Sequence, residues 1–482
     1  MSLHKKMVHG AFWSLLEKGG QQGLSLIVFL VLARLLGPAE YGLANLCFIF
    51  FTLTCMITAG LLDGIVSNQI EDDLQLSSLF WGIIGIGTAI SLLCILIAGP
   101  LSEFMDEPKL KMLLIWFSVI PLLVALPAVP NLLLLKEMAF KVYAIRAIAA
   151  TIIGGVVGIY MAQKNYGAYA IIGQQIALYA VTNLIIWRAV SWRPRMLFDR
   201  SAFLAAIKPG MSVMGVNVLG FVDGQAPRFF IAKILGAEAL GYFALAIRLR
   251  FSLTEILITS PLAVVYPALA KLRNDVPQQK NIVEALFYLS GLIVFPILAI
   301  AIATAPQYVP LFFGIKWVPA VPVLQIYILG AALAPALIII QQLLRANGQM
   351  FSFFRASGFF IIANLAMGLL LFLENGLVWM SFGILAVTLV SLIYYITLVN
   401  KKLNISIGSC VAELVWPLAG SVLIVLAITL FQYASEFKNY PTIDLIFSCI
   451  LGFLIYGVFC AIFQYKNIKN MFNKIKQLRQ NT

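Results

Sequence analysis

The sequence has very few charged residues and almost no histidine. Only 11% of its 482 residues are charged, whereas 62% are hydrophobic, a composition that a water-soluble domain does not reach. The two histidines, His4 and His9, precede the first long apolar run, which excludes a histidine proton relay deep inside a membrane. The sequence therefore predicts an integral membrane protein.

The sequence also lacks the cysteine spacing of a metal site or a disulfide framework. None of its six cysteines forms a CxxC pair, and all lie within or beside apolar runs: Cys47, Cys55, Cys94, Cys410, Cys449 and Cys460. We interpret them as small packing residues and expect no metal and no bound cofactor. The net charge of +13 does not indicate nucleic acid as a partner, because no soluble domain could hold a basic face.

Apolar runs of membrane-spanning length recur from one end of the chain to the other. A helix needs about 20 apolar residues to cross a hydrocarbon core of roughly 30 Å, and windows of that length give about fourteen candidate spans. The fold class predicted is therefore an all-α polytopic membrane protein. Most lysines and arginines fall on one set of connections, which predicts that both termini are cytoplasmic. The opposite connections carry few: Lys109, Lys111, Lys164, Lys316 and Lys438.

A short motif occurs twice, which indicates an internal repeat. "LARLLGPAEYGLANL" covers residues 32–46 and "IAKILGAEALGYFAL" covers 231–245, so Gly37 corresponds to Gly236 and Gly42 to Gly241. The first and seventh predicted spans therefore end in the same turn. Because six predicted spans separate the copies, both have the same orientation, as in transporters with two parallel lobes. A chance match in a sequence of low complexity is the alternative.

The repeat predicts a division of the chain into two six-helix lobes and an appendage. We expect a first lobe over 1–187 and a second over 209–399, joined by a cytoplasmic linker over 188–208, "RAVSWRPRMLFDRSAFLAAIK". The linker mixes cations with Trp, Phe and Leu, which predicts an interfacial helix over about 188–208. Two further helices would occupy 400–464, and a basic cytoplasmic tail 465–482.

Charged residues inside the predicted spans gather on only a few of them. The candidate cations for an anionic ligand are Lys18, Arg228, Arg248 and Arg250, and the acids are Glu17, Asp63, Asp223 and Glu255. Each such residue costs roughly 2.5–3.5 kcal/mol at a helix centre, so they must face a wet or protein-lined interior. One interpretation is a water-filled cationic cavity, since arginine binds phosphate in a bidentate manner. The other is structural ion pairing between helices.

Helix breakers accompany these charges. Gly224 and Pro227 lie between Asp223 and Arg228 in "GFVDGQAPRFFIAKIL", which predicts a hinge at that point of the seventh span. The acids could balance the cations or bind a driving H⁺ or Na⁺.

Two stretches resemble a known family. "ARLLGPAEYGLANL" is similar to the start of polysaccharide flippases of the Wzx/PST type, and "LGAEALGYFALAIRLRFSLTEILITSPLAVVYPALAKLRND" is similar to their second-lobe signature. The family belongs to the MOP superfamily, with the MATE drug exporters and the lipid II flippase, so the resemblance implies a V-shaped two-lobed fold. It also implies movement of an undecaprenyl-pyrophosphate-linked oligosaccharide across the bacterial inner membrane for capsule, exopolysaccharide or O-antigen synthesis, alongside polymerase or export machinery.

Three alternatives stay open. A lipid II flippase differs only in the head group of its substrate, and charges alone cannot separate it from an oligosaccharide flippase. A MATE-like cation-coupled drug exporter would be expected to have a cavity dominated by acids. A membrane-embedded glycan polymerase or ligase would be an enzyme, but the predicted outer connections are too short for a large catalytic loop, so we expect no enzymatic activity.

Overall fold

The protein is described from a computed structural model that covers residues 3–68, 72–137, 139–262, 265–273, 275–370, 376–403, 408–412, 414–434, 440–465, 467 and 469. These residues form helices and no strand, as the composition predicts. The predicted basic tail, 465–482, lies almost entirely outside the described residues.

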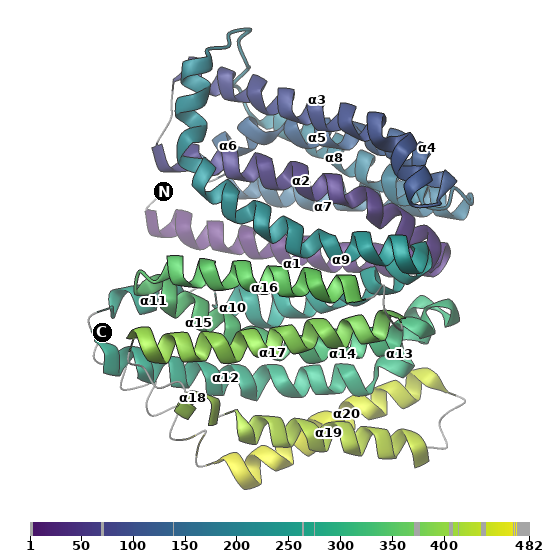
Figure 1. The fold of residues 1–482 in the computed structure, drawn as a ribbon, viewed down its shortest axis with the longest axis vertical. Coiled ribbons are helices and arrows are strands. Elements are labelled where there is room, and N and C mark those ends of the chain that lie inside the picture. The colour runs from purple at the N-terminus through teal and green to yellow at the C-terminus, as the bar shows by residue number, and fades with distance from the viewer. Residues whose placement is uncertain are drawn as a thin grey trace. The chain divides into compact units, whose positions relative to one another are not determined.

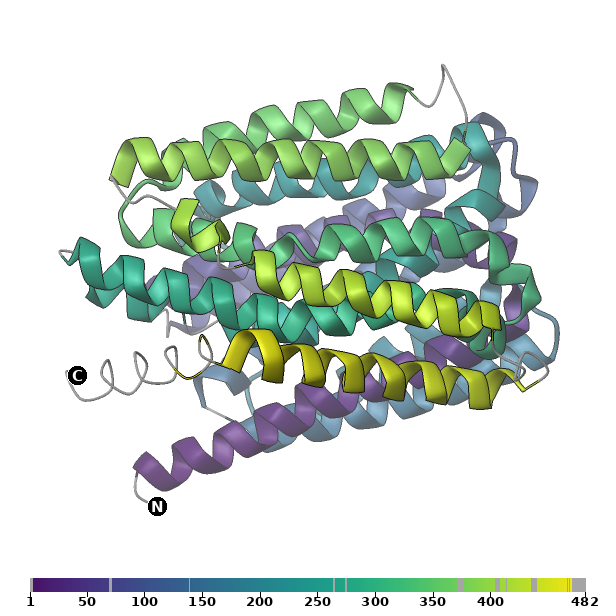
Figure 2. The same ribbon diagram turned by 90° about the horizontal axis from the view of Figure 1, so that it is seen from below.

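The chain divides into two compact units, residues Met1–Ala244 and Leu245–Thr482 (Figures 1 and 2). The first unit contains α1 (Leu3–Leu36), α2 (Pro38–Asn68), α3 (Asp73–Phe104), α4 (Pro108–Phe117), α5 (Val119–Ala125), α6 (Ala128–Lys136), α7 (Phe140–Gln163), α8 (Tyr169–Ala189) and most of α9 (Arg200–Thr254). In this unit α7 lies between α1 and α8.

The second unit begins near the end of α9 and contains the remaining helices. They are η1 (Glu255–Thr259), α10 (Ser260–Leu262), α11 (Val265–Lys271), α12 (Val276–Ala303), α13 (Ala305–Phe313), η2 (Ile315–Ala320), α14 (Val321–Ala331), α15 (Ala334–Ala346), α16 (Met350–Leu370), α17 (Gly376–Leu403), α18 (Gly408–Ala412), α19 (Val415–Ala434), α20 (Pro441–Phe459) and η4 (Cys460–Gln464). Within this unit α12 packs against α14 and α19, and α17 packs against α14 and α16.

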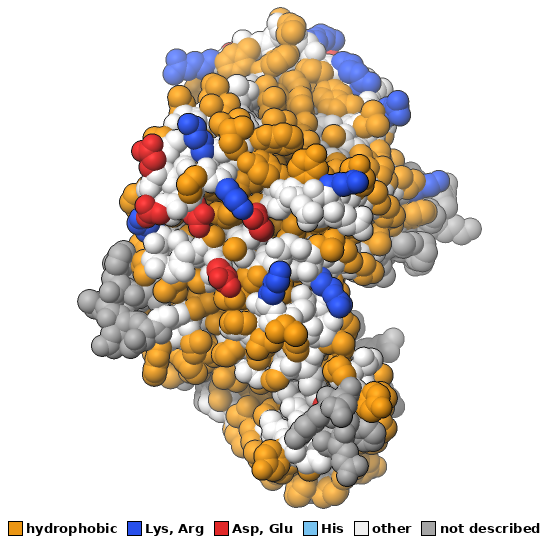
Figure 3. All heavy atoms as spheres, turned by 90° about the vertical axis from the view of Figure 1, so that its right-hand side faces the viewer, with side chains coloured by type: hydrophobic (Ala, Val, Ile, Leu, Met, Phe, Trp, Pro, Cys, Tyr) orange, Lys and Arg blue, Asp and Glu red, His pale blue; other side chains and the backbone are white. Residues whose placement is uncertain are grey.

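The described residues include 12 helical stretches that are long and apolar enough to cross a membrane. One of them, Gly220–Thr259, has 40 residues, about twice the length that one crossing needs. A shorter apolar helix covers Phe351–Met367, where the sequence predicts a short span. The expected number of fourteen is therefore approximate. Figure 3 shows hydrophobic side chains over much of the face viewed, with charged side chains in a limited part of it.

Both copies of the repeated motif contain the same glycine turn. α1 ends before Gly37, which has a φ of 81°, and α9 is interrupted at Gly236, which has a φ of 84°. Glycine adopts a positive φ at little cost because it has no Cβ. The prediction that the first and seventh spans end in one kind of turn is confirmed.

The two turns also pack against each other, backbone to backbone, inside the first unit. A Cβ at Gly42 would lie 1.8 Å from the carbonyl oxygen of Ala237, and a Cβ at Gly241 would lie 2.0 Å from that of Pro38. Pro38 and Ala237 occupy equivalent positions of the repeat. The contact is therefore reciprocal, as in an interface related by a two-fold axis.

The prediction of an interfacial helix over 188–208 is wrong for the first half of the linker. Residues 190–199 are not helical, and the helix resumes only at Arg200, as the start of α9. The strap, by which we mean residues 190–199, is bound to α3: Arg195 N donates to Ser77 Oγ at 3.1 Å, and Trp81 Nε1 donates to Arg195 O at 2.8 Å. These bonds satisfy the backbone of an extended segment, so it does not need helical hydrogen bonds.

Asp199 ends the strap and caps the helix that follows. Its Oδ1 accepts hydrogen bonds from Ser201 N at 2.7 Å and from Ser201 Oγ at 2.8 Å, while Asp199 N donates to Ser78 Oγ at 3.0 Å. The hydrogen bonds from Ser201 lower the pKa of the Asp199 carboxyl, because they favour its charged form. The strap is thus fixed to α3 at both Arg195 and Asp199.

Candidate functional site

The four candidate cations lie on two helices. Lys18 is exposed on α1, and Arg228 is partly buried on α9 before the break at Gly236. Arg248 and Arg250 lie after that break, in the second unit. The structure describes each unit by itself, so a single cavity that all four cations share stays a prediction.

Arg228 is held within its own helix. Its Nη1 donates a hydrogen bond to Gln225 Oε1 at 3.0 Å, and Gln225 is buried. The side chain one turn earlier therefore positions the guanidinium. α9 keeps helical backbone angles at Gly224 and Pro227, and its non-helical residue is Gly236. A hinge at Gly224 and Pro227 stays a prediction.

Arg250 lies in a small cavity of the second unit that is lined by both polar and apolar side chains. Its guanidinium carbon is 5.9 Å from the centre of the Tyr327 ring, close enough for a cation–π interaction. Ser381 and Thr388 of α17 also line this cavity, whose volume is about 40 Å³. A cavity of this size has room for water but not for a sugar or a pyrophosphate.

The hydroxyl groups around Arg250 can accept hydrogen bonds but already donate elsewhere. Ser381 Oγ donates to Leu377 O, and Thr388 Oγ1 donates to Ile384 O, each at 2.8 Å. Within the described part of the chain, no carboxylate makes an ion pair with Arg250.

The candidate acid Glu17 has a partner that the sequence did not predict. Arg146 Nη2 lies 3.3 Å from Glu17 Oε1, and each side chain is 18% exposed. Arg146 also donates from Nη1 to Asn131 Oδ1 at 3.0 Å, and its guanidinium carbon lies 4.8 Å from the centre of the Tyr143 ring. For Glu17, structural pairing is thus the better interpretation, and α7 supplies the cation.

Whether the other three acids lie close together stays a prediction. Asp223 lies on α9 in the first unit, and Glu255 begins the π-helix η1 in the second. Asp63 belongs to α2, but its side chain lies outside the described residues. The described residues contain no group of three or more His, Cys, Asp or Glu that could hold a metal ion. Binding of H⁺ or Na⁺ by these acids stays a prediction.

Arg146 was the residue missed by sequence reasoning. α7 begins at Phe140, so Arg146 lies about 9 Å into the helix at ~1.5 Å per residue. Its spacing of three from Tyr143 places both side chains on one helix face, which was the only available signal.

The fold resembles those of solved membrane transporters. The chain is similar to a structure described as "Lipid II flippase MurJ, inward closed conformation", with a TM-score of 0.74, 16% identity and coverage of 95% of this chain and 100% of that one. A structure of a multidrug resistance MATE family transporter of the MOP superfamily, in an inward-facing conformation, matches with a TM-score of 0.56 and 15% identity over 80% of this chain and 94% of that chain.

The sequence profile of the family described as "Polysaccharide biosynthesis protein" matches residues 31–322. The chain belongs to this family, and its 12 apolar helical stretches make it a multi-pass membrane protein.

Curated relatives carry names from polysaccharide synthesis. The succinoglycan biosynthesis transport protein ExoT of Rhizobium meliloti (strain 1021) is 24% identical over 66% of this chain and 65% of its own length. The lipopolysaccharide biosynthesis protein WzxC of Escherichia coli (strain K12) is 24% identical over 68% of this chain and 67% of its own length. The chain therefore spans about two thirds of the length of these relatives.

Proposed function

We propose that the protein is a flippase that moves an undecaprenyl-pyrophosphate-linked oligosaccharide across the bacterial inner membrane. The observation that carries this proposal is Arg250, a cation inside a membrane-spanning helix with no carboxylate partner among the described residues. A charge in that position is expensive and marks a functional site by default. Among anionic ligands, phosphate groups match the donor geometry of arginine.

Family membership and fold support the same function. Relatives are named for the transport or biosynthesis of polysaccharides, and the fold is shared with a lipid II flippase and with MATE transporters. Family and relatives indicate a transporter rather than a catalytic enzyme. We propose that the oligosaccharide enters from the cytoplasmic leaflet and leaves at the periplasmic one by alternating access. Lys18, Arg228, Arg248 and Arg250 would face its pyrophosphate in a conformation that widens the cavity around Arg250, which has a volume of about 40 Å³ in this structure.

A genetic test separates this function from that of a lipid II flippase. The gene is introduced into one strain blocked in the export of its O-antigen or capsule repeat unit, and into another that lacks its lipid II flippase. Restoration of surface polysaccharide in the first strain alone supports the proposal. Growth of the second strain without any rescue of the first would contradict it and assign lipid II as the substrate.

Charge-reversal variants test the role of the cations in the same strain. Each of the four cations is changed to Glu, and Lys111, which is exposed on α4, is changed to Glu as a control. We expect Arg250→Glu to lose export at wild-type amounts of folded protein, and Lys111→Glu to retain it. Full export by all four cation variants would overturn the cationic site.

A further inference from the structure

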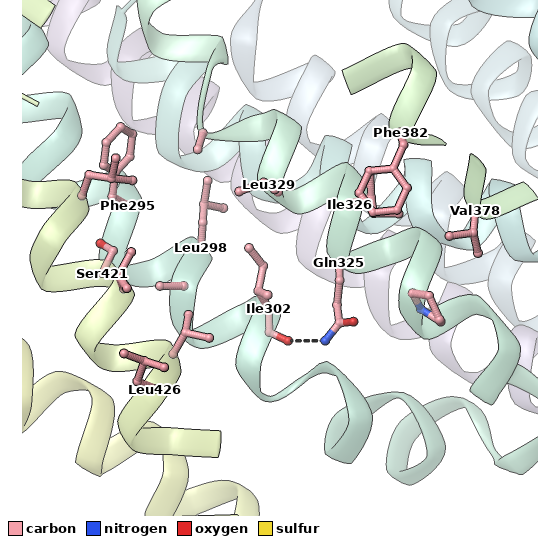
Figure 4. A pocket seen from close by; sticks show the side chains of 16 residues that line it. Phe295, Leu298, Ile302, Gln325, Ile326, Leu329, Val378, Phe382, Ser421 and Leu426 are labelled. Carbon is pink, nitrogen blue, oxygen red and sulfur yellow. Dashed lines mark hydrogen bonds between the residues drawn. The ribbon is translucent and has the colours of Figure 1, made fainter. Parts of the chain in front are cut away.

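A long apolar groove lies in the second unit beside the cavity around Arg250, and Ile326 lines both. It has a volume of about 520 Å³ and is lined by side chains of α12, α14, α17 and α19, as well as Ala332 directly after α14 (Figure 4). Such a volume is typical of small-molecule sites. Its lining contains no Lys, Arg, Asp or Glu, and Gln325 and Ser421 are its only polar side chains.

Both polar side chains of the groove are engaged with the protein itself. Gln325 Nε2 donates to Ile302 O at 3.0 Å, the bond drawn in Figure 4. Ser421 Oγ donates to Pro417 O at 2.8 Å. A cavity whose remaining surface is hydrocarbon does not hold ordered water, so an occupant of this groove has to be apolar along its whole length.

The groove is accessible from the surroundings of the helices. Phe382 of α17 is 47% exposed, and Leu418 and Leu426 of α19 are 52% and 53% exposed, although all three line the groove. Each of the four helices lies in a stretch that is apolar and long enough to cross a membrane. The surroundings are then lipid, and the molecules able to enter from the side are lipid chains.

The length of the groove favours a fatty-acyl chain over a longer polyprenyl chain. Its lining runs along α14 from Pro322 to Ala332, a rise of about 15 Å at ~1.5 Å per residue. That is half of a hydrocarbon core of roughly 30 Å, or one leaflet. A fatty-acyl chain spans one leaflet, whereas an undecaprenyl chain is several times longer.

We propose that this groove is a binding site for one acyl chain of a membrane phospholipid. The chain fills the space between α17 and α19 and supplies the dispersion contacts that an empty groove would lack. Because no cation lines the groove, the site does not select an anionic head group, and a zwitterionic lipid such as phosphatidylethanolamine suits it. This inference is independent of the substrate that the protein exports.

Photolabelling with a modified phospholipid tests the site directly. The full-length protein is reconstituted in vesicles of phosphatidylethanolamine that carry a photoreactive diazirine in one acyl chain, and the labelled peptides are identified by mass spectrometry. We expect labelling of peptides from α12, α14, α17 and α19, and its loss in Ala332→Phe, because the added ring fills the groove. Val425→Phe, from the opposite wall, should give the same loss.

A matched control lies on the same lipid-facing surface. Ala386 of α17 is exposed and does not line the groove, so Ala386→Phe should label like the wild-type protein. Equal labelling of the groove peptides in all three variants would overturn the proposal. A chase on the wild-type protein needs no substitution: excess unlabelled phosphatidylethanolamine should displace the label, and displacement by undecaprenyl phosphate alone would assign the groove to a polyprenyl chain instead.

Discussion

The turn at Gly37 and the turn at Gly236 have nearly the same φ, 81° and 84°, but the side chains around them differ. In the first turn, Glu40 accepts hydrogen bonds from Lys109 Nζ at 2.7 Å and from Ala168 N at 2.8 Å. The first turn is thereby joined to α4 and to the start of α8.

In the second turn, the acid Glu238 bonds within its own helix, whereas the cation Lys233 bonds to residues distant in the sequence. Glu238 accepts a hydrogen bond from Tyr242 Oη at 2.6 Å, four residues along the same helix. Lys233 Nζ donates to Phe104 O, at the last residue of α3, at 2.6 Å, and to Asp106 Oδ2, just after that helix, at 2.8 Å. The comparison shows that the repeat has retained a backbone geometry, whereas the polar contacts of each copy have become specific.

Substitution of Gly42 or Gly241, which pack backbone to backbone, should have the largest effect on the two similar turns. Gly42→Ala and Gly241→Ala each place a methyl group within 2.0 Å of a carbonyl oxygen, and relieving such overpacking costs about 1–3 kcal/mol or more. We expect both variants to lose thermal stability in detergent by similar amounts, because their contacts are reciprocal. The double variant should lose less than the sum of the two, since either one already separates the turns.

Gly85→Ala is the control for this pair. Gly85 lies inside α3, and a Cβ there would meet nothing within 4 Å. Alanine should stabilise this helix by about 0.5–1 kcal/mol. Unfolding temperatures of Gly42→Ala and Gly241→Ala at or above that of the wild-type protein would show that the turns do not pack as described.

The break in α9 gives a second, smaller effect. Gly236→Ala meets no atom within 4 Å, so its cost comes from the positive φ alone and should be about 1–2 kcal/mol. Gly224→Ala, in an open helical position of the same helix, should not destabilise. Thermal unfolding of the two variants measures the difference, and equal unfolding temperatures would contradict a turn at Gly236.

Substitution of the acids Glu40 and Glu238 should have the smallest effect on stability, and the effect should differ between the two copies of the motif. Glu40→Gln removes an ion pair with Lys109, whose side chain is 64% exposed, and pairs of this kind contribute about 0.2–1 kcal/mol. Glu238→Gln removes no ion pair that the structure describes and should change stability less. Raising the salt concentration should reduce the difference between the two variants, and a difference that grows with salt would argue against an electrostatic cause.

Local sequence signals predicted most of the fold. Apolar runs located the spans, and the glycine spacing of the repeated motif predicted both turns, because a positive φ is a property of the residue itself. The helix predicted for the linker was wrong because the prediction rested on amphipathic composition and took no account of Pro194, which does not continue a helix. It also could not include the buried hydroxyls of Ser77 and Ser78, which accept hydrogen bonds from the linker backbone.

The candidate site was less predictable because it depends on contacts between distant helices. Glu17 and Arg146 are 129 residues apart, and nothing in either segment specifies the other. Arg250 could be identified as a charge inside a span, but its neighbours Tyr327, Ser381 and Thr388 come from helices that fold against it. Residue type could only nominate candidate side chains, and packing determined their partners.

Because the strap is bound to α3, little of the chain between α8 and α9 is free to move. An extended segment of residues 190–199 could reach about 33–36 Å if it were free, but its bonds to Ser77, Ser78 and Trp81 hold it along α3. The connection between α8 and α9 is therefore fixed at Asp199 and cannot extend to its full length. Residues inserted before Arg195 would lengthen a loop on α3 without giving α9 any additional reach.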